Sequence, residues 1–271
     1  MRIFWKLFDF YINCSIHVAI SCFALVKLTE YMFFISASNN VSNFAFFGTI
    51  IGYNFIKYNA LALSKNHLMS KELKAIAVVS FLSFLSACYY FFQFQISTKL
   101  IGFIYLITTI LYALPFFPNK KNARNFKGIK IFVVAFCWVG VTVILPFVES
   151  NLEITPDFYL KCIQRYVLIF GLILIFEIID LQTDDLYLQT VPQKIGVKRT
   201  KIIGIFLLLL FYFLEFLKSN FNSLQMFINA ILIVVTSLFL LFASERKSKY
   251  YTSFWVESIP IFWYFLLLIF R

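Results

Sequence analysis

The sequence predicts an all-α integral membrane protein, and two observations support that fold class. The first is composition: of 271 residues 61% are apolar and 14% charged, with a mean hydropathy of +0.84. Soluble domains average about 45–50% apolar and about 25% charged residues. The second is that apolar runs such as 202–214 and 259–270 do not alternate with polar residues, as strands of a transmembrane β-barrel would. A soluble enzyme, a disordered chain and a coiled coil are excluded as well.

Apolar runs long enough to cross a membrane occur nine times along the chain. A membrane helix needs about 20 apolar residues. The nine runs lie near residues 10–30, 40–61, 74–95, 99–118, 129–148, 158–180, 200–217, 222–243 and 253–270. We therefore expect a nine-transmembrane-helix bundle that forms a single domain over 1–271, with no separate soluble domain.

The distribution of basic residues predicts an orientation. If the N-terminus is cytoplasmic, the segments on the cytoplasmic side hold 18 lysines and arginines and the opposite segments hold 5. Cytoplasmic segments of membrane proteins carry such an excess. The net charge of +11 is thus explained by membrane orientation and attraction to anionic lipid, and we expect no nucleic-acid partner. We place the protein in the plasma or inner membrane, with its cavity open to cytoplasm and lipid.

Four acids at the cytoplasmic end of the sixth run are the main candidates for a functional site. Glu177, Asp180 and Asp184 are spaced i, i+3 and i+7, which predicts one helical face, while Asp185 lies off it. Acids at membrane depth are costly and tend to mark function. Because neighbouring carboxylates repel one another, we expect Mg²⁺ to join these four, completing its shell with substrate phosphate. The alternative is a solvated helix end paired with nearby lysines.

The loop that follows these acids shows a resemblance to a known family. Asp180 and Asp184 form D-x-x-x-D, and Thr190, Pro192 and Gly196 form T-x-P-x-x-x-G in a predicted ordered turn. Together with nine spans and the cytoplasmic side, this pattern resembles the second aspartate motif of the UbiA superfamily of intramembrane prenyltransferases. The resemblance implies transfer of a prenyl group from a prenyl diphosphate to a membrane-embedded acceptor, assisted by Mg²⁺.

The end of the fourth run is similar to another segment of that family. Tyr112 precedes two prolines and then Lys120 and Lys121. In the family the lysine of such a segment lies near the diphosphate, so the resemblance implies that Tyr112, Lys120 and Lys121 contribute to diphosphate binding. The alternative is an interfacial tyrosine and lysines that obey the cytoplasmic charge bias.

The first aspartate motif of the family is not matched at the end of the second run. Asn54 stands for the family's asparagine, but Phe55 and Tyr58 occupy positions where aspartates are expected. The resemblance implies two-magnesium chemistry, and this difference counts against it. We hypothesise that the lysine between them, Lys57, replaces the missing metal site as a cation for the diphosphate beside Asn54. The alternative is a lysine that extends to the cytoplasmic interface.

Polar residues of the first run form a stripe. Asn13, His17 and Ser21 are spaced i, i+4 and i+8. Asn13 and His17 are weak candidates for contacts with the acceptor, and hydrogen bonds between helices are the favoured alternative. Lys27 and Glu30, spaced i, i+3, are expected to form an ion pair at the outer interface.

The function we expect is that of a UbiA-like transferase acting on isoprenoid substrates. Asp180, Asp184 and Lys57 are the expected catalytic residues, and the partners are a prenyl diphosphate, a lipophilic acceptor and membrane lipid. Two alternatives stay open. One is a catalytically degenerate bundle that binds isoprenoid or anionic lipid without turnover. The other is a transporter, against which we find no internal repeat or paired broken helices in the sequence. Prenyl chain length, acceptor and oligomeric state cannot be inferred.

Overall fold

The computed structural model describes residues 2–36, 39–63, 70–114, 128–219 and 222–270. Within these ranges the chain is helical and contains no strand, which confirms the predicted fold class. The main helices are α1 (Arg2–Asn13), α2 (Ile16–Met32), α3 (Asn40–Leu63), α4 (Lys71–Phe92), α5 (Ile96–Ala113), α6 (Lys130–Val139), α7 (Leu145–Glu149), α8 (Pro156–Ile179), α9 (Val191–Ile195), α10 (Val197–Phe213), α11 (Ser223–Phe242) and α12 (Ile259–Phe270).

Within the described residues, each of the nine predicted runs overlaps one or more helical segments. By length and apolar character, seven helices of the described ranges can cross a membrane, or eight if the bent pair α1 and α2 is one span. The helix α3 is not among them, although it has 24 residues and packs between α2 and α4. The count of nine therefore stays a prediction.

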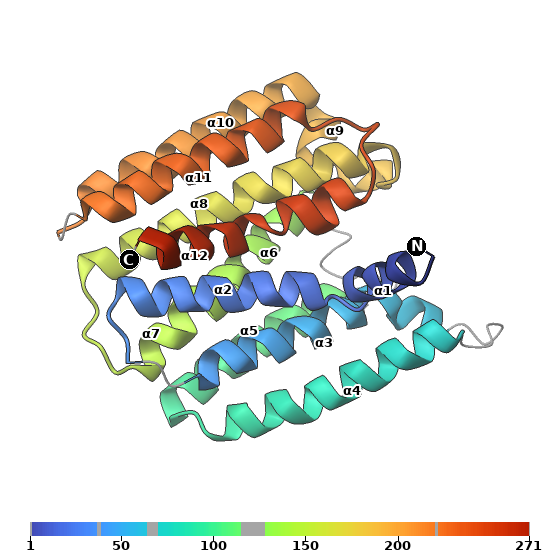
Figure 1. The fold of residues 1–271 in the computed structure, drawn as a ribbon, viewed down its shortest axis with the longest axis horizontal. Coiled ribbons are helices and arrows are strands. Elements are labelled where there is room, and N and C mark those ends of the chain that lie inside the picture. Colours follow the sequence, from blue (N-terminus) through green and yellow to red (C-terminus); the bar gives the residue numbers. More distant parts are fainter. Residues whose placement is uncertain (1, 37–38, 64–69, 115–127, 220–221, 271) are drawn as a thin grey trace.

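The long helices run side by side, and the connections alternate between the two ends of the bundle (Figure 1). The N-terminus, α9 and the connection from α11 to the last span lie at one end, which we call the motif end. The C-terminus and the start of α8 lie at the opposite end. The described segments that carry the excess of lysine and arginine thus gather at the motif end. This is the arrangement that the predicted orientation requires.

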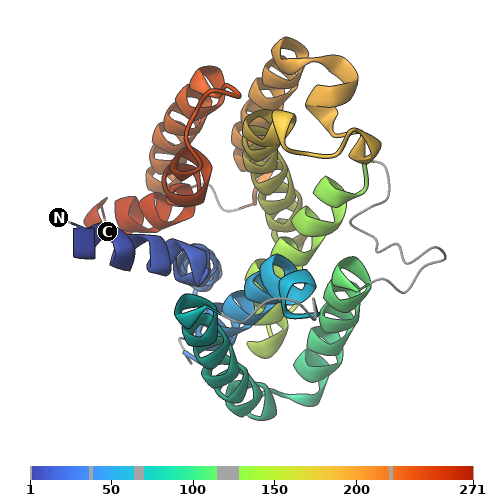
Figure 2. The ribbon, with the colours of Figure 1, turned by 90° about the vertical axis from the view of Figure 1, so that its right-hand side faces the viewer.

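The core is centred on α8, which α6, α10 and α11 surround. Buried side chains of α8 such as Leu168 and Ile175 pack with Phe211, Leu232 and Trp263. In α4, by contrast, large apolar side chains are mostly exposed, and only 17% of its span is buried against 67% for the α8 span. Exposed apolar side chains on a membrane helix are suited to contact with lipid tails. Figure 2 looks onto the motif end and shows α4 on the far side of the bundle from α10.

A buried arginine ties four segments of this core together. Arg165 in α8 is fully buried, and its Nη1 donates to the carbonyl of Leu25 (3.1 Å) and to Oγ1 of Thr142 (2.9 Å). Its Nη2 donates to Oγ1 of Thr29 (3.2 Å), and the guanidinium lies 5.5 Å from the centre of the Trp263 ring. Hydrogen bonds and an aromatic face can compensate for the loss of water around such a charge.

The first and last spans are interrupted. The first was predicted as one helix, and this prediction is wrong: α1 and α2 meet at a bend of 54°. Ser15 at the bend has φ 61°, outside the right-handed helical region. The last span begins as a π-helix, η7 (Tyr251–Val256), and turns at Glu257 and Ser258 before α12 starts. Backbone groups released at such breaks need other partners.

Candidate active site

The acids of the sixth span do not lie on one helical face, so that prediction is wrong. The helix α8 ends at Ile179, and Asp180 begins a 3₁₀ turn. The carbonyl oxygen of Asp180 accepts from the backbone N–H of Thr183 (2.9 Å) and of Asp184 (2.8 Å). The α-helix therefore ends before both aspartates, and Asp184 follows the 3₁₀ turn instead of lying on α8.

Glu177 has a structural role in the geometry seen here. Its side chain is 2% exposed, and Oε2 accepts from the backbone N–H of Val191 at 3.0 Å. Val191 is the first residue of α9, where helical N–H groups lack partners within the helix. The carboxylate therefore holds the start of α9 against the end of α8. The side chain of Gln193 completes the loop, because its Nε2 donates to the carbonyls of Asp184 and Asp185 (both 3.3 Å).

The charge partner of Asp184 comes from another span. The ammonium of Lys130, at the start of α6, lies 3.4 Å from Oδ2 of Asp184. Both side chains are largely buried, with 21% and 13% exposed. The partner is therefore not one of the nearby lysines that follow the motif in sequence. The pair joins the entrance of α6 to the turn after α8.

Two carboxylates suit a magnesium ion here better than four do. Within the described ranges, no group of three or more His, Cys, Asp or Glu side chains could hold a metal ion. Glu177 is engaged by Val191, and Oδ1 of Asp185 accepts from the backbone N–H of Tyr187 (3.0 Å). Asp180 and Asp184 carry the other two carboxylates, of which Asp184 pairs with Lys130, and Mg²⁺ is often held by one or two carboxylates plus phosphate. The donor set fits one such ion, and its binding stays a prediction.

Of the residues predicted to bind diphosphate, Lys120 and Lys121 lie outside the described residues. Tyr112 is buried at the end of α5, which contacts both α3 and α6. The hydroxyl of Tyr53 accepts from Nε1 of Trp138 at 3.3 Å. Tyr112 thus lies in the interior of the bundle, and its predicted role stays untested.

The residues at the predicted first motif face several neighbours. Asn54 is buried; its Nδ2 donates to Oγ of Ser80 in α4 (2.9 Å), whereas its Oδ1 has no hydrogen-bond partner among the described residues. Nζ of Lys57 donates to Oγ of Ser15 (2.9 Å) at the bend between α1 and α2. Phe55 is exposed, and the hydroxyl of Tyr58 donates to the carbonyl of Asn13 (3.0 Å). No carboxylate stands at these positions, and the diphosphate role of Asn54 and Lys57 stays a hypothesis.

The polar stripe of the first span binds the interrupted last span. Nε2 of His17 lies 2.9 Å from both the carbonyl of Phe254 and Oγ of Ser258, and Nδ1 lies 2.7 Å from the hydroxyl of Tyr11. Oγ of Ser21 donates to the carbonyl of Glu257. These contacts favour the interhelical alternative for His17. Nδ2 of Asn13, the other candidate, donates to Glu72 (3.0 Å).

Glu257 is a residue that the sequence reasoning missed. It stands at the turn between η7 and α12 and keeps part of its surface accessible. Its backbone carbonyl accepts from Oγ of Ser21 in α2. The signal was present: it is an acid inside the predicted run 253–270, and acids at membrane depth tend to be functional.

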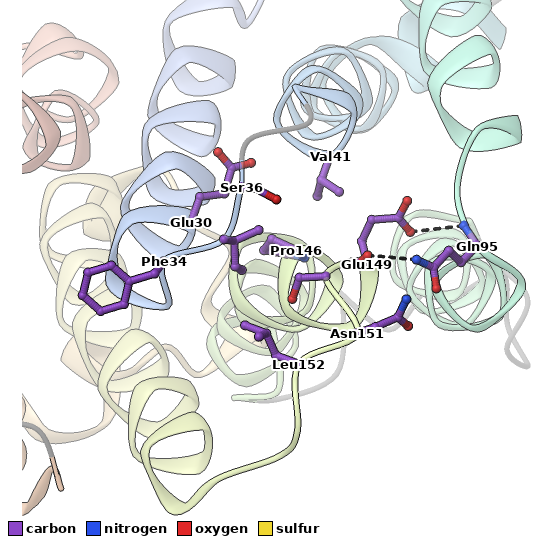
Figure 3. Close-up of a pocket in the computed structure, with 11 residues that line it drawn as sticks. Glu30, Phe34, Ser36, Val41, Gln95, Pro146, Glu149, Asn151 and Leu152 are labelled. Carbon is purple, nitrogen blue, oxygen red and sulfur yellow. Dashed lines mark hydrogen bonds between the residues drawn. The ribbon is translucent and has the colours of Figure 1, made fainter.

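A cavity of about 350 Å³ lies elsewhere, at the opposite end of the bundle. Glu30 and Glu149 line it, and Glu149 holds the backbone N–H and side chain of Gln95 (both 3.2 Å; Figure 3). Glu30 pairs with Lys27 at 2.7 Å, which confirms the predicted ion pair. This cavity is separate from the acids of the motif end.

Comparison with known proteins gives a similarity in structure. No family model matches the chain, and no curated protein matches it. A solved structure, described as providing "structural and mechanistic insights into the biosynthesis of Digeranylgeranylglyceryl phosphate synthase in membranes", is similar with a TM-score of 0.58 and 17% sequence identity. The similarity covers 98% of this chain and 96% of that chain.

The chain shares the fold of that solved structure. The resemblance inferred from the second aspartate motif is confirmed at the level of the fold. Together with the apolar helices, this fold identifies the protein as an integral, multi-pass membrane protein.

The structure corrects one part of the argument against a transporter, namely that the chain has no broken helices. Broken helices are present, at Ser15 between α1 and α2 and at Glu257 in the last span, and they lie against each other through His17 and Ser21. The absence of broken helices was therefore the wrong reason.

Proposed function

We propose that this protein transfers a prenyl group from a prenyl diphosphate to a lipophilic acceptor within the membrane. The observation that supports the proposal is the UbiA-type fold over 98% of the chain, with Asp180 and Asp184 placed at one end of the bundle beside a buried lysine. The solved structure of similar fold is that of a digeranylgeranylglyceryl phosphate synthase in membranes.

The residues of the motif end can stabilise the charge that develops on the leaving diphosphate. When bound, a magnesium ion held by Asp180 and Asp184 supplies positive charge to the phosphate oxygens. The ammonium of Lys130, 3.4 Å from Asp184, adds a fixed cation at the same place. Fixed charges aimed at developing charge are often the largest contribution to such catalysis.

The prenyl part of the substrate suits the aromatic residues in which the chain is rich. The chain contains 37 phenylalanines, and aromatic faces attract cations such as the allylic carbon after the diphosphate leaves. The pairing of Glu177 with Val191 keeps α9 closed over the end of α8. Active-site loops held this way exclude water from the reacting carbon.

A bundle that binds isoprenoid without turnover is the second candidate, and one observation favours it. Phe55 and Tyr58 stand where the family has aspartates, and neither side chain can hold a metal ion as a carboxylate does. The two candidates differ in chemistry, because only the enzyme releases diphosphate.

The test is release of diphosphate by the purified protein in detergent. Prenyl diphosphates of several lengths are offered with a hydroxyl or an aromatic acceptor, in Mg²⁺ or in EDTA. We expect Mg²⁺-dependent release that disappears in the Asp180→Asn, Asp184→Asn double variant and persists in Asp157→Asn, an acid at the opposite end. Mg²⁺-dependent donor binding without release under every condition would favour the non-catalytic bundle.

A further inference from the structure

A groove of about 330 Å³ runs along the outer side of α10, beside α11. The two helices lie side by side at one edge of the bundle (Figure 1). The groove is apolar except at one end, and it is lined by Ile202, Ile205, Phe206, Leu209 and Leu241, with Lys198 and Lys201 at that end. Ile202, Phe206 and Leu209 are exposed, so on a membrane helix they face the lipid. The groove is therefore open to the hydrocarbon of the membrane.

The groove lies beside a close contact between the two helices. A Cβ at Gly204 of α10 would lie 2.5 Å from Cδ2 of Leu240 in α11, so the helices can approach here only because Gly204 has no side chain. The next residue of each helix, Ile205 and Leu241, lines the groove. The groove is thus a consequence of how α10 packs on α11.

The length of the groove corresponds to one leaflet of the membrane. Lys198 and Leu209, the outermost lining residues of α10, are 11 positions apart. At the rise of an α-helix this separation is about 16 Å. Half of the hydrocarbon core of a bilayer is about 15 Å thick. An acyl chain of the leaflet at the motif end therefore matches the groove in length.

Two ammonium groups stand where the groove reaches the motif end. Nζ of Lys201 crosses to α11 and donates to the carbonyl of Leu241 (2.7 Å). An ammonium has three N–H donors, and this is the one hydrogen bond of Lys201 within the described ranges. Lys198, one turn earlier, is exposed, and neither lysine belongs to an ion pair of the described residues. Their charge is thus available to an anion from outside the chain.

We propose that this groove binds one anionic phospholipid from the leaflet at the motif end. An acyl chain lies along Ile202, Phe206 and Leu209. The phosphate contacts the ammonium groups of Lys198 and Lys201, and the positive N-terminal end of α10 favours it at the same level. Charge and apolar surface act on two parts of one molecule, which distinguishes such a lipid from a free anion. The inference does not rest on the proposed transferase activity.

The test compares two lipids with the same acyl chains and different headgroups. Dioleoylphosphatidylglycerol is anionic and dioleoylphosphatidylcholine has no net charge. Native mass spectrometry of the full chain, released from detergent micelles, gives the dissociation constant of the first lipid bound. Two lysines at the headgroup predict about 30-fold tighter binding of the phosphatidylglycerol. The Lys198→Gln, Lys201→Gln double variant should lose this preference, although glutamine at position 201 can still donate to Leu241.

The chain offers a matched control for the change in charge. Lys71 and Lys74 are also three residues apart at the start of a membrane helix, α4, at the motif end. The Lys71→Gln, Lys74→Gln variant removes the same charge and should keep the preference. If the groove variant does not fold, Lys198→Gln alone replaces it. This exposed lysine has no hydrogen bond in the described ranges, and its loss should reduce the preference about fivefold.

A second pair of variants tests the apolar part of the groove. Phe206→Ala removes an exposed ring that lines the groove and should weaken the binding of phosphatidylglycerol about 3- to 10-fold. Phe213→Ala removes an equally exposed type of ring from the same helix outside the groove and should leave the binding unchanged.

Three results would overturn the inference. The first is equal affinity of the wild-type protein for the two lipids, and the second is an unchanged preference in the groove variant. The third is an equal loss in the Lys71→Gln, Lys74→Gln variant, because attraction by the whole basic end would then explain the preference. Binding of geranylgeranyl diphosphate that is lost in the groove variant, while the preference for phosphatidylglycerol stays, would assign the groove to the prenyl donor instead.

Discussion

The carboxylate of Glu177 accepts a hydrogen bond from the backbone N–H of Val191 at 3.0 Å, within the interior of the motif end. The two residues are 14 positions apart and belong to α8 and α9. Glu177, which the sequence groups with three possible metal ligands, thus closes the loop between α8 and α9. The distinction between a loop-closing and a metal-binding acid can be measured.

Replacing Glu177 separates the two roles. Glu177→Leu leaves the N–H of Val191 without its partner, which should cost about 1–3 kcal/mol of unfolding free energy. Glu177→Gln can still accept this hydrogen bond through its amide oxygen and should be close to the wild type in thermal unfolding in detergent. Its Mg²⁺-dependent donor binding should also be retained. Loss of that binding in Glu177→Gln, without loss of stability, would return Glu177 to the metal site.

Lys130 should matter for the affinity of the diphosphate. Lys130→Met removes the cation 3.4 Å from Asp184 and leaves the two aspartates to repel an anionic ligand. We expect about 10- to 100-fold weaker binding of a prenyl diphosphate, with the larger loss in EDTA, measured by equilibrium binding. Lys74→Met, in α4, is the control and should bind as the wild type does. Equal affinity for the Lys130 and Lys74 variants would show that Lys130 only neutralises Asp184.

Gly140 begins the π-helical segment η3 (Gly140–Ile144) of the fifth predicted span, and it packs under the ring of Tyr105. A Cβ at Gly140 would lie 2.0 Å from that ring, so Gly140→Ala must push Tyr105 out of its buried position. The expected cost is about 1–3 kcal/mol, as for other overpacked cores.

Gly48→Ala is the matched control for this prediction. A Cβ at Gly48, in α3, meets nothing within 4 Å, and alanine favours helix over glycine by about 1 kcal/mol. Thermal unfolding of both variants in the same detergent compares them. If Gly140→Ala unfolds no lower than Gly48→Ala, then Tyr105 moves aside freely and the packing described here is not tight.

The local sequence determined which segments are helices and where the candidate acids lie. Apolar runs of about 20 residues require helices at membrane depth, because every backbone group must be satisfied within the segment. The basic residues could be assigned to one end because lysine and arginine concentrate in the cytoplasmic segments of membrane proteins. The motif around Asp180 and Asp184 predicted the fold that the similarity in structure then showed.

Only the tertiary structure decided what each polar side chain contacts. Glu177 follows the helical pattern of Asp180 and Asp184 in sequence, yet the chain turns at Asp180 and brings Val191 to it instead. Glu257 is 236 residues from Ser21 in sequence, yet its backbone carbonyl accepts from Oγ of Ser21 because the broken last span packs against α2. The spacing of residues along a helix determines only which face of that helix their side chains occupy. Partners from distant segments are set by how the helices pack, which no local pattern contains.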